Sequence, residues 1–380
     1  MIVGFTSTGS KRPDSLFGPE RAGLPERMQR SSGCTVEAGG RTYLDFIMAL
    51  GAVALGYGHP AVNEAVLEAV QRGGVGPLAP EDEAGFAAEL SRAIPALEQV
   101  LFLKTGAEAV AAAVRIARVA TGRERVISCG YHGWLDWCGD AAGIPTPTRA
   151  LRESIPFNDA ERTRSLLRAA GDSIAAVVIE PVIDTAPGGD WLAVLRDETA
   201  RSGVVLVFDE IKTAFRLAIG GATERWGIVP DLLVLGKAMA NGFPLAAVGG
   251  ARNVMQHATG TWISSTLATE FVSFAAARAT LRVMRERDVP HHLATAGARL
   301  WRGLDRLATE YPALGIAAAG IPEMCYLRHS SEERSYRVTV ECARRGLLFK
   351  RTAYNFVSLA HDDAAIDQAL TVLAEALAAC

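Results

Sequence analysis

Two side chains with complementary chemistry follow two apolar runs of the sequence. Asp209 ends the run Val204–Asp209, and Lys237 comes directly after Leu232–Gly236. Because the carboxyl ends of parallel strands meet at one edge of a sheet, we expect this carboxylate and this amine to lie close together. A lysine amine can bond to a carbonyl carbon, and an aspartate can keep a nitrogen heterocycle protonated. A pyridoxal phosphate (PLP) site needs both groups, so Lys237 and Asp209 are the predicted catalytic residues.

Lysine is scarce in this chain, which narrows the choice of nucleophilic amine. The 39 basic residues include five lysines: Lys11, Lys104, Lys212, Lys237 and Lys350. Lys212 lies near Asp209 in the sequence, but on the turn that follows it, where we expect its amine to face solvent. Lys237 is therefore the predicted nucleophile, although a lysine after a strand is more often simply solvated.

Other chemistries that use a strand-end aspartate find little support. A magnesium-holding aspartate of an ATPase requires a GxxxxGK[ST] loop, but the only Gly-Lys pair is Gly236-Lys237. Asp231 stands where the first glycine belongs, and Ala238 follows the lysine. The sequence also has no GxGxxG between a strand and a helix, which argues against a nicotinamide dehydrogenase.

A phosphate group needs its own donors, and one segment has the pattern for them. Thr105, Gly106 and Ala107 lie between the predicted strand Val100–Leu103 and the predicted helix Glu108–Ala120. Free N–H groups and the positive end of a helix stabilise a phosphate dianion. The alternative is an ordinary tight strand–helix turn, and the residues alone leave both open.

Three further candidate side chains lie at or after the ends of two other predicted strands. Tyr131 and His132 follow Arg125–Cys129, and the tyrosine ring could stack on a flat cofactor; core packing for Tyr131 and a structural role for His132 are the alternatives. Glu180 lies in the apolar run Ala175–Val182, where a carboxylate is costly to bury without a partner. We therefore expect Glu180 to find a partner near Asp209, or else to lie at a solvated strand end.

The predicted elements define an α/β fold with a second, smaller domain. Short apolar runs separated by helical stretches indicate a mostly parallel sheet covered on both faces. We assign residues 46–275 to this large domain and residues 276–380 to a smaller α+β domain, which residues 1–45 join. Thr269–Arg287, His291–Glu310 and Asp362–Ala379 are predicted helices, and Glu323–Leu327 and Asn355–Leu359 are strand-like. The predicted strands of the large domain are Val100–Leu103, Arg125–Cys129, Ala175–Val182, Val204–Asp209, Leu232–Gly236 and Ala246–Gly249.

Composition excludes several classes of protein. The 380 residues are 49% hydrophobic and 21% charged, which is too apolar for a disordered chain. The net charge of −3 argues against a nucleic-acid or membrane-surface partner. The six cysteines show no metal-ligand spacing, and no secretory segment or membrane span is evident. We expect a cytoplasmic enzyme with reduced thiols and no bound metal.

Six segments, in order, resemble one known family. They are CTVEAGGRTYLDFIMALGAVALGYGHP, KTGAEAVAAAVRIARVATGRERVISCGYHGW, VVIEPV, VVLVFDEIKTAFRLA, PDLLVLGKAMANGFPLAAVGG and TWISSTLATEFVSFAAA, with a weaker echo in GLLFKRTAYNFVSLAHDD. Together they resemble the class III PLP-dependent aminotransferases, in particular the glutamate-1-semialdehyde aminomutase-like branch.

The resemblance implies a fold type I homodimer with PLP bound at the subunit interface. It implies that Lys237 is the Schiff-base lysine, that Asp209 partners the pyridine nitrogen and that Thr266 reaches the neighbouring subunit's cofactor. Tyr131 and Ile211 would contact the two ring faces, and Glu180 the ring edge. The predicted cofactor-binding set is Thr105, Gly106, Ala107, Tyr131, His132, Glu180, Asp209, Ile211, Lys237 and Thr266.

Two departures from the family pattern bear on activity. Ala107 stands where the family usually has threonine, so we expect weaker cofactor binding. Ala353 stands where the aminomutase branch carries an acidic residue. We therefore predict an aminotransferase that passes an amino group from a small amino donor to a keto or aldehyde acceptor. The alternatives are an aminomutase or racemase with the same cofactor, and a non-catalytic protein of the same fold.

Overall fold

The computed structural model describes residues 2–380 and divides the chain into two compact units. The first, called the sheet unit here, is Ala61–Arg287. The second, called the terminal unit, combines the segment up to Pro60 with Asp288–Cys380. The predicted domain boundaries at residues 45 and 275 fall earlier than these. Backbone hydrogen bonds from Phe46 to Leu348 and from Leu359 to Ala54 explain why the segment after residue 45 stays with the terminal unit.

A seven-stranded sheet forms the centre of the sheet unit. Its strands lie in the order β4-β10-β9-β8-β7-β5-β6, and all neighbours are parallel except β10, which is antiparallel to both β4 and β9. The strands are β4 Gln99–Leu103, β5 Arg125–Cys129, β6 Arg152–Ser154, β7 Ile174–Ile179, β8 Val205–Asp209, β9 Leu232–Leu235 and β10 Ala246–Gly250. This confirms the α/β class and the mostly parallel sheet.

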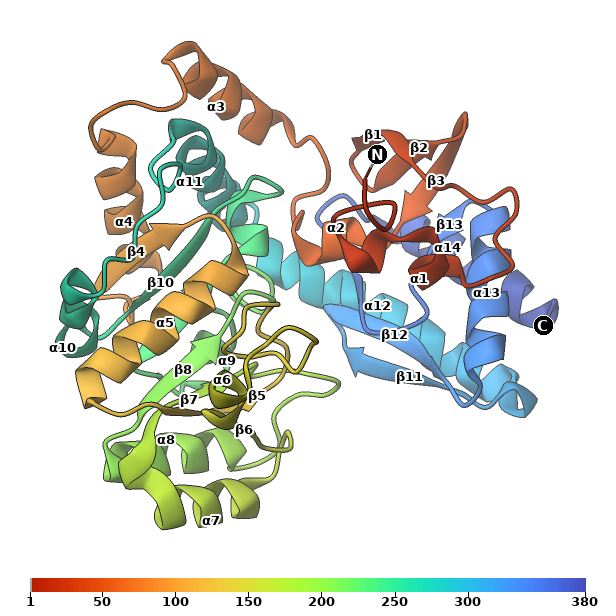
Figure 1. Cartoon of the computed structure of the whole chain (residues 1–380). Helices are drawn as coiled ribbons and strands as arrows, with labels where there is room; N and C mark the ends of the chain where they lie inside the picture. Colours follow the sequence, from red (N-terminus) through yellow and green to blue (C-terminus); the bar gives the residue numbers. More distant parts are fainter. Residues whose placement is uncertain (1) are drawn as a thin grey trace. The chain divides into compact units, whose positions relative to one another are not determined.

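Helices cover both faces of this sheet (Figure 1). Along β8, Val205 and Val207 pack toward α5, whereas Leu206 and Phe208 pack toward α7 and α8. Both faces of the strand are thus buried, which is why its sequence is apolar at consecutive positions. The helices of the unit are α3 Pro60–Gln71, α4 Glu81–Ala93, α5 Gly106–Thr121, α6 Thr146–Ala150, α7 Ala160–Ala170, α8 Trp191–Ser202, α9 Gly221–Trp226, α10 Arg252–Met255 and α11 Phe271–Glu286.

Strand β7 ends earlier than the predicted run Ala175–Val182. It stops at Ile179, because Pro181 has no N–H to donate to a neighbouring strand. Glu180 makes the last backbone hydrogen bond of this ladder, from its N–H to the carbonyl of Cys129. This early end allows the Glu180 side chain to turn toward the loop after β5.

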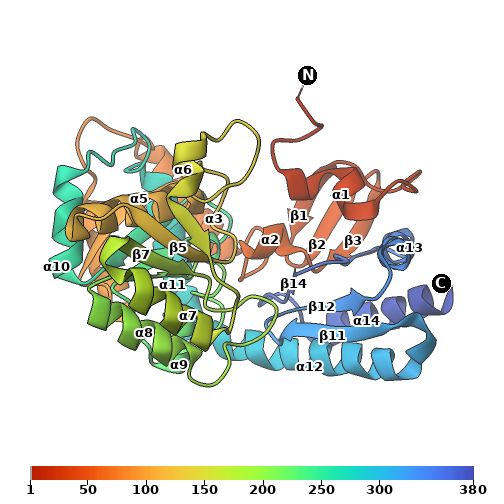
Figure 2. The same ribbon diagram turned by 60° about the horizontal axis from the view of Figure 1, so that its bottom comes forward.

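The terminal unit contains two small sheets and three long helices. One sheet has the order β1-β2-β3-β13 and the other β11-β12-β14. Its strands are β1 Met28–Ser32, β2 Thr35–Ala38, β3 Arg41–Asp45, β11 Ile316–Ile321, β12 Met324–His329, β13 Leu347–Leu348 and β14 Asn355–Phe356. Its helices are α1 Pro13–Phe17, α2 Met48–Gly51, α12 Val289–Glu310, α13 Glu332–Arg344 and α14 Asp363–Ala378, and Figure 2 shows α12 running along β11 and β12.

The predicted C-terminal helices are confirmed with small shifts. Helix α11 ends at Glu286, and α12 begins at Val289 rather than at His291. Pro290 lies in the first turn of α12, where its missing N–H leaves no hydrogen bond unmade. Among the described residues, no helix has both the length and the apolar character that a membrane span needs.

Candidate active site

Asp209 is the last residue of β8 and is buried at the carboxyl edge of the sheet. Its side chain is 4% exposed, and its Oδ2 lies 2.8 Å from Nδ1 of His132. Its Oδ1 accepts the N–H of Ile211 at 3.2 Å. Two partners therefore fix the carboxylate, and each oxygen still has a lone pair available.

The neighbouring carboxylate, Glu210, is directed elsewhere. It accepts the N–H groups of Ala222 and Thr223 and both threonine hydroxyls, those of Thr213 and Thr223. Burial raises the pKa of Glu210, and these hydrogen bonds oppose that rise. Glu210 therefore holds the turn after β8 against α9, and Asp209 is the carboxylate left for chemistry.

Lys237 follows β9, the strand next to β8 in the sheet. Its φ of +44° is in the left-handed region, which is unusual for a residue with a β-carbon. Burial lowers the pKa of the Lys237 ammonium, and the charges of Lys212 and Arg216 lower it further. The carboxylates of Asp209 and Glu180 act in the opposite direction. Lys237 therefore lies within the range of the Asp209 charge, at the end of the neighbouring strand, and its environment favours the neutral amine more than solvent would.

Glu180 has an ion-pair partner, as expected for a buried carboxylate, but the partner is Lys212, which was predicted to face solvent. Its Oε1 lies 2.9 Å from Nζ of Lys212, and its Oε2 accepts the N–H of Tyr131 at 2.8 Å. The prediction that Lys212 faces solvent is wrong, since the residue is only 8% exposed. The turn after Asp209 is itself buried, with Thr213 and Arg216 fully covered, so Lys212 lies inside the fold and not on its surface.

The predicted phosphate segment forms the amino terminus of α5. The Thr105 hydroxyl accepts the N–H of Glu108, and the Glu108 carboxylate accepts the N–H of Thr105, which closes a capping box. The first backbone bond of the helix runs from Ala109 to Thr105. The N–H groups of Gly106 and Ala107 precede it, and helix geometry gives them no intrahelical acceptor. Two backbone donors at a positive helix end are thus available to an anion.

Close approaches place this helix end beside the other site residues. A β-carbon at Gly106 would lie 2.5 Å from Cδ1 of Ile211, so only glycine allows the helix to come this near to the turn after Asp209. A β-carbon at Gly133 would lie 2.6 Å from that of Ala107, and the φ of Gly133 is +104°. The loop Tyr131–Gly133 therefore packs directly on the start of α5. One contiguous site results, and all of it belongs to the sheet unit.

The aromatic residues after β5 have different environments. Tyr131 is 73% exposed and Trp134 is 77% exposed, whereas His132 is buried and stacks on Trp137 with ring centroids 5.9 Å apart. Ile211 is partly buried, and Thr105 and Thr266 are exposed. The ring contacts of Tyr131 and Ile211, and the reach of Thr266 to a neighbouring subunit, stay predictions.

The donor set of this site fits PLP on three counts. A buried lysine with a lowered pKa suits a nucleophilic amine, and a buried, fixed aspartate suits a protonated pyridine nitrogen. The start of α5 supplies backbone donors for the phosphate. By contrast, no group of three or more potential metal ligands occurs among residues 2–380.

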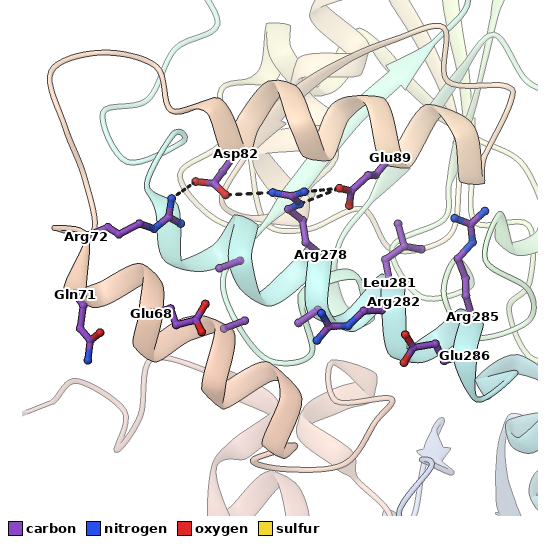
Figure 3. Close-up of a pocket in the computed structure, with 13 residues that line it drawn as sticks. Glu68, Gln71, Arg72, Asp82, Glu89, Arg278, Leu281, Arg282, Arg285 and Glu286 are labelled. Carbon is purple, nitrogen blue, oxygen red and sulfur yellow. Dashed lines mark hydrogen bonds and ion pairs between the residues drawn. The ribbon is translucent and has the colours of Figure 1, made fainter.

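A separate pocket of about 710 Å³ lies between α3, α4 and α11, and Figure 3 shows the residues that line it. Arg278 lies between Asp82 and Glu89 there, with its closest contact to Glu89 at 2.6 Å, and Arg72 also pairs with Asp82. These arginines are thus neutralised within the pocket. None of the predicted site residues lines it.

The most informative contact that the sequence did not reveal is the one between His132 and Asp209. The two residues are 77 positions apart, and only the parallel order of β5, β7 and β8 brings their strand ends together. Lys212 was likewise missed as a site residue. Its signal was its place three residues after Asp209, near which Glu180 was expected to find a partner.

A sheet of this order with a lysine and an aspartate at its carboxyl edge defines a PLP-dependent enzyme of fold type I. The model of the aminotransferase class-III family matches residues 19–377, and the chain belongs to that family. The predicted family and cofactor are thereby confirmed, and PLP is the cofactor of this enzyme.

Two relatives that match this chain along most of its length carry the same name. A glutamate-1-semialdehyde 2,1-aminomutase from Thermomicrobium roseum is 36% identical over 385 residues, covering 90% of this chain and 88% of the relative. An enzyme of the same name from Roseiflexus castenholzii is 32% identical over 415 residues, covering 98% and 96%. These names support the aminomutase alternative better than the aminotransferase that the sequence analysis favoured.

Solved structures share the fold along nearly the whole chain. The FumI protein of Sphingopyxis sp. MTA144, determined in a PLP form, superposes with a TM-score of 0.92 at 25% identity, covering 98% of this chain and 92% of that one. An omega-transaminase from Sphaerobacter thermophilus gives a TM-score of 0.85 at 26% identity, covering 92% and 90%. The fold therefore also occurs in an enzyme named as a transaminase.

Proposed function

We propose that this enzyme relocates an amino group within one substrate, as the name of its relatives describes, with glutamate 1-semialdehyde as the substrate to test first. The observation that carries the proposal is a buried Lys237 on which the charge of the buried Asp209–His132 couple acts, in a chain 36% identical to a named aminomutase. When bound, PLP supplies an aldehyde that bonds reversibly to amines and a ring that withdraws electrons from the substrate carbon.

Each site residue has a role in this proposal. The neutral amine of Lys237 holds the cofactor and, once displaced, takes a proton from one carbon and returns it to another. Asp209 holds the proton on the pyridine nitrogen, and His132 fixes the carboxylate at 2.8 Å. The N–H groups of Gly106 and Ala107 hold the phosphate. Tyr131 and Ile211 would contact the faces of the ring, and Glu180 would lie near its edge.

Transfer of the amino group between two molecules is the second candidate, and one residue favours it. The aminomutase branch carries an acidic residue where this chain has Ala353. Both reactions use the same proton movement at Lys237, so the described site serves either. We also propose that the enzyme acts as a homodimer in which the exposed Thr266 reaches the neighbouring cofactor.

One experiment separates the two functions. Purified holoenzyme is incubated with glutamate 1-semialdehyde as the sole substrate, and the isomer with its amino group on carbon 1 is quantified, with Lys237→Ala as the inactive control. Accumulation of many equivalents of isomer per enzyme without any second substrate supports the aminomutase. Turnover that begins only when a separate amino donor and carbonyl acceptor are added would contradict it and support the aminotransferase.

A further inference from the structure

Lys212 places a second buried cation beside the predicted nucleophile. Its Nζ forms a 2.9 Å ion pair with Glu180, and both side chains are almost covered, at 7% and 12% exposed. The other oxygen of Glu180 is fixed by the N–H of Tyr131 at 2.8 Å. A buried pair of this kind has a defined geometry and little screening by water.

Four charges act on the Lys237 amine, and they form two opposed sets. Lys212 and Arg216, both on the turn after β8, are the cations. Asp209 at the end of β8 and Glu180 after β7 are the anions. Asp209 is already engaged by His132 and the N–H of Ile211, and Glu180 is engaged by Lys212 and the N–H of Tyr131. Each carboxylate near Lys237 thus has other partners.

Removal of the Lys212 charge would change the protonation of Lys237. Without the Lys212 charge, Glu180 would be a buried anion that lacks a cation, and the nearby Lys237 would be the group able to compensate it as an ammonium. An ammonium has no lone pair and cannot attack a carbonyl carbon. Lys212 itself, held against Glu180, is not available as a competing nucleophile.

We propose that Lys212 is a positioning residue that holds Glu180 in an ion pair and so keeps the Lys237 amine neutral and ready to capture the cofactor aldehyde. The proposal deepens the proposed function, since it assumes that Lys237 is the residue that PLP attaches to. It explains why Lys212 is buried on a turn where the sequence alone predicted an exposed lysine. The lowered pKa of Lys237, to which burial contributes most and Lys212 next, agrees with this role.

The test measures the protonation of Lys237 directly in the apoenzyme. Trace acetic anhydride acylates only neutral amines, and mass spectrometry of the Lys237 peptide gives the extent of labelling from pH 6 to pH 11. The chain has only five lysines, so the peptides are easily resolved. The variants are Lys212→Met, which removes the charge, Lys212→Arg, which keeps it, and the double variant Glu180→Gln with Lys212→Met, which removes both charges of the pair.

The proposal expects the labelling midpoint of Lys237 to rise by about one pH unit in Lys212→Met, which is a tenfold smaller neutral fraction at lower pH. Capture of added PLP at neutral pH, followed by absorbance, should slow in parallel. Lys212→Arg and the double variant should both return the midpoint to near the wild-type value. A purely structural lysine would instead leave the midpoint unchanged, or would make the double variant as defective as Lys212→Met, and either result overturns the proposal.

The wild-type protein shows whether a negative result concerns the proposed function or only the role of Lys212. If PLP does not attach to Lys237 in the wild type, the proposed function fails. If PLP attaches there while the variants leave the midpoint of Lys237 unmoved, only the role of Lys212 fails.

Discussion

At the scale of single residues, the environment of a carboxylate decides its use. Asp209 and Glu210 are adjacent, and both are buried. The Glu210 carboxylate accepts four hydrogen bonds from the following turn and α9. The Asp209 carboxylate contacts one ring nitrogen, that of His132, and one backbone N–H, that of Ile211. The first arrangement stabilises the fold, and the second leaves capacity for a ligand. This difference yields a paired prediction.

Asp209→Asn should abolish most of the activity without unfolding the protein. The amide keeps the shape of the side chain but cannot hold a pyridine nitrogen in its protonated form by charge, so we expect a loss in kcat of about 100-fold or more. Glu210→Gln is the matched control, because it places N–H groups against N–H donors and should cost about 2 kcal/mol of stability. Activity assays and thermal unfolding on both variants check this. Full activity in Asp209→Asn would contradict the assignment.

At the scale of elements, the strands and their ends were predictable, and the contacts between them were not. Residues 205–208 and 232–235 are apolar at consecutive positions because helices cover both faces of the sheet, and this pattern is visible in the sequence. The Lys212–Glu180 pair depends on a buried turn, which leaves no such periodic signal. The same holds for α2, where Met48, Ala49 and Leu50 all have positive φ. Left-handed backbone at non-glycine residues cannot be read from residue type.

The start of α5 gives a prediction at this scale. Ala107 offers a backbone N–H but no hydroxyl, so Ala107→Thr should add one hydrogen bond to the phosphate and tighten PLP binding about fivefold. Ala107→Val has the same branched shape without the oxygen and should not tighten binding. Equilibrium dialysis of PLP against each apoenzyme measures the Kd. Equal affinities of the threonine and valine variants would show that the phosphate is not held at this position.

At the scale of the whole molecule, the two compact units carry different kinds of buried charge. The candidate active site of the sheet unit holds buried ionisable groups in pairs, Asp209 with His132 and Glu180 with Lys212. The terminal unit contains His329, whose pKa is lowered to about 4, first by burial and then by Arg334 and Arg351. Its Nδ1 is buried without a hydrogen-bond partner among the described residues. The folded state therefore requires the neutral imidazole, whereas the unfolded chain titrates near the ordinary value of about 6.5.

The sign of the resulting pH effect follows from linkage. Between pH 6.5 and pH 4 the unfolded state binds a proton that the folded state refuses, so stability falls as the pH falls through this window. Above it, the contribution of His329 is constant. Urea unfolding at pH 7, 6, 5 and 4 should show this decline, and His329→Gln should flatten it. An unchanged pH dependence in His329→Gln would rule out this histidine as its source.

The central claim is that PLP is held by the amine of Lys237, and borohydride reduction of the holoenzyme tests it most directly. Reduction fixes the cofactor to whichever lysine carries it, and peptide mass spectrometry locates the added phosphopyridoxyl mass among the five lysines. The structure predicts one equivalent on Lys237 and none on Lys212, the buried lysine beside it. Modification of Lys212 or of any other lysine in place of Lys237, or no covalent attachment at all, would contradict the account.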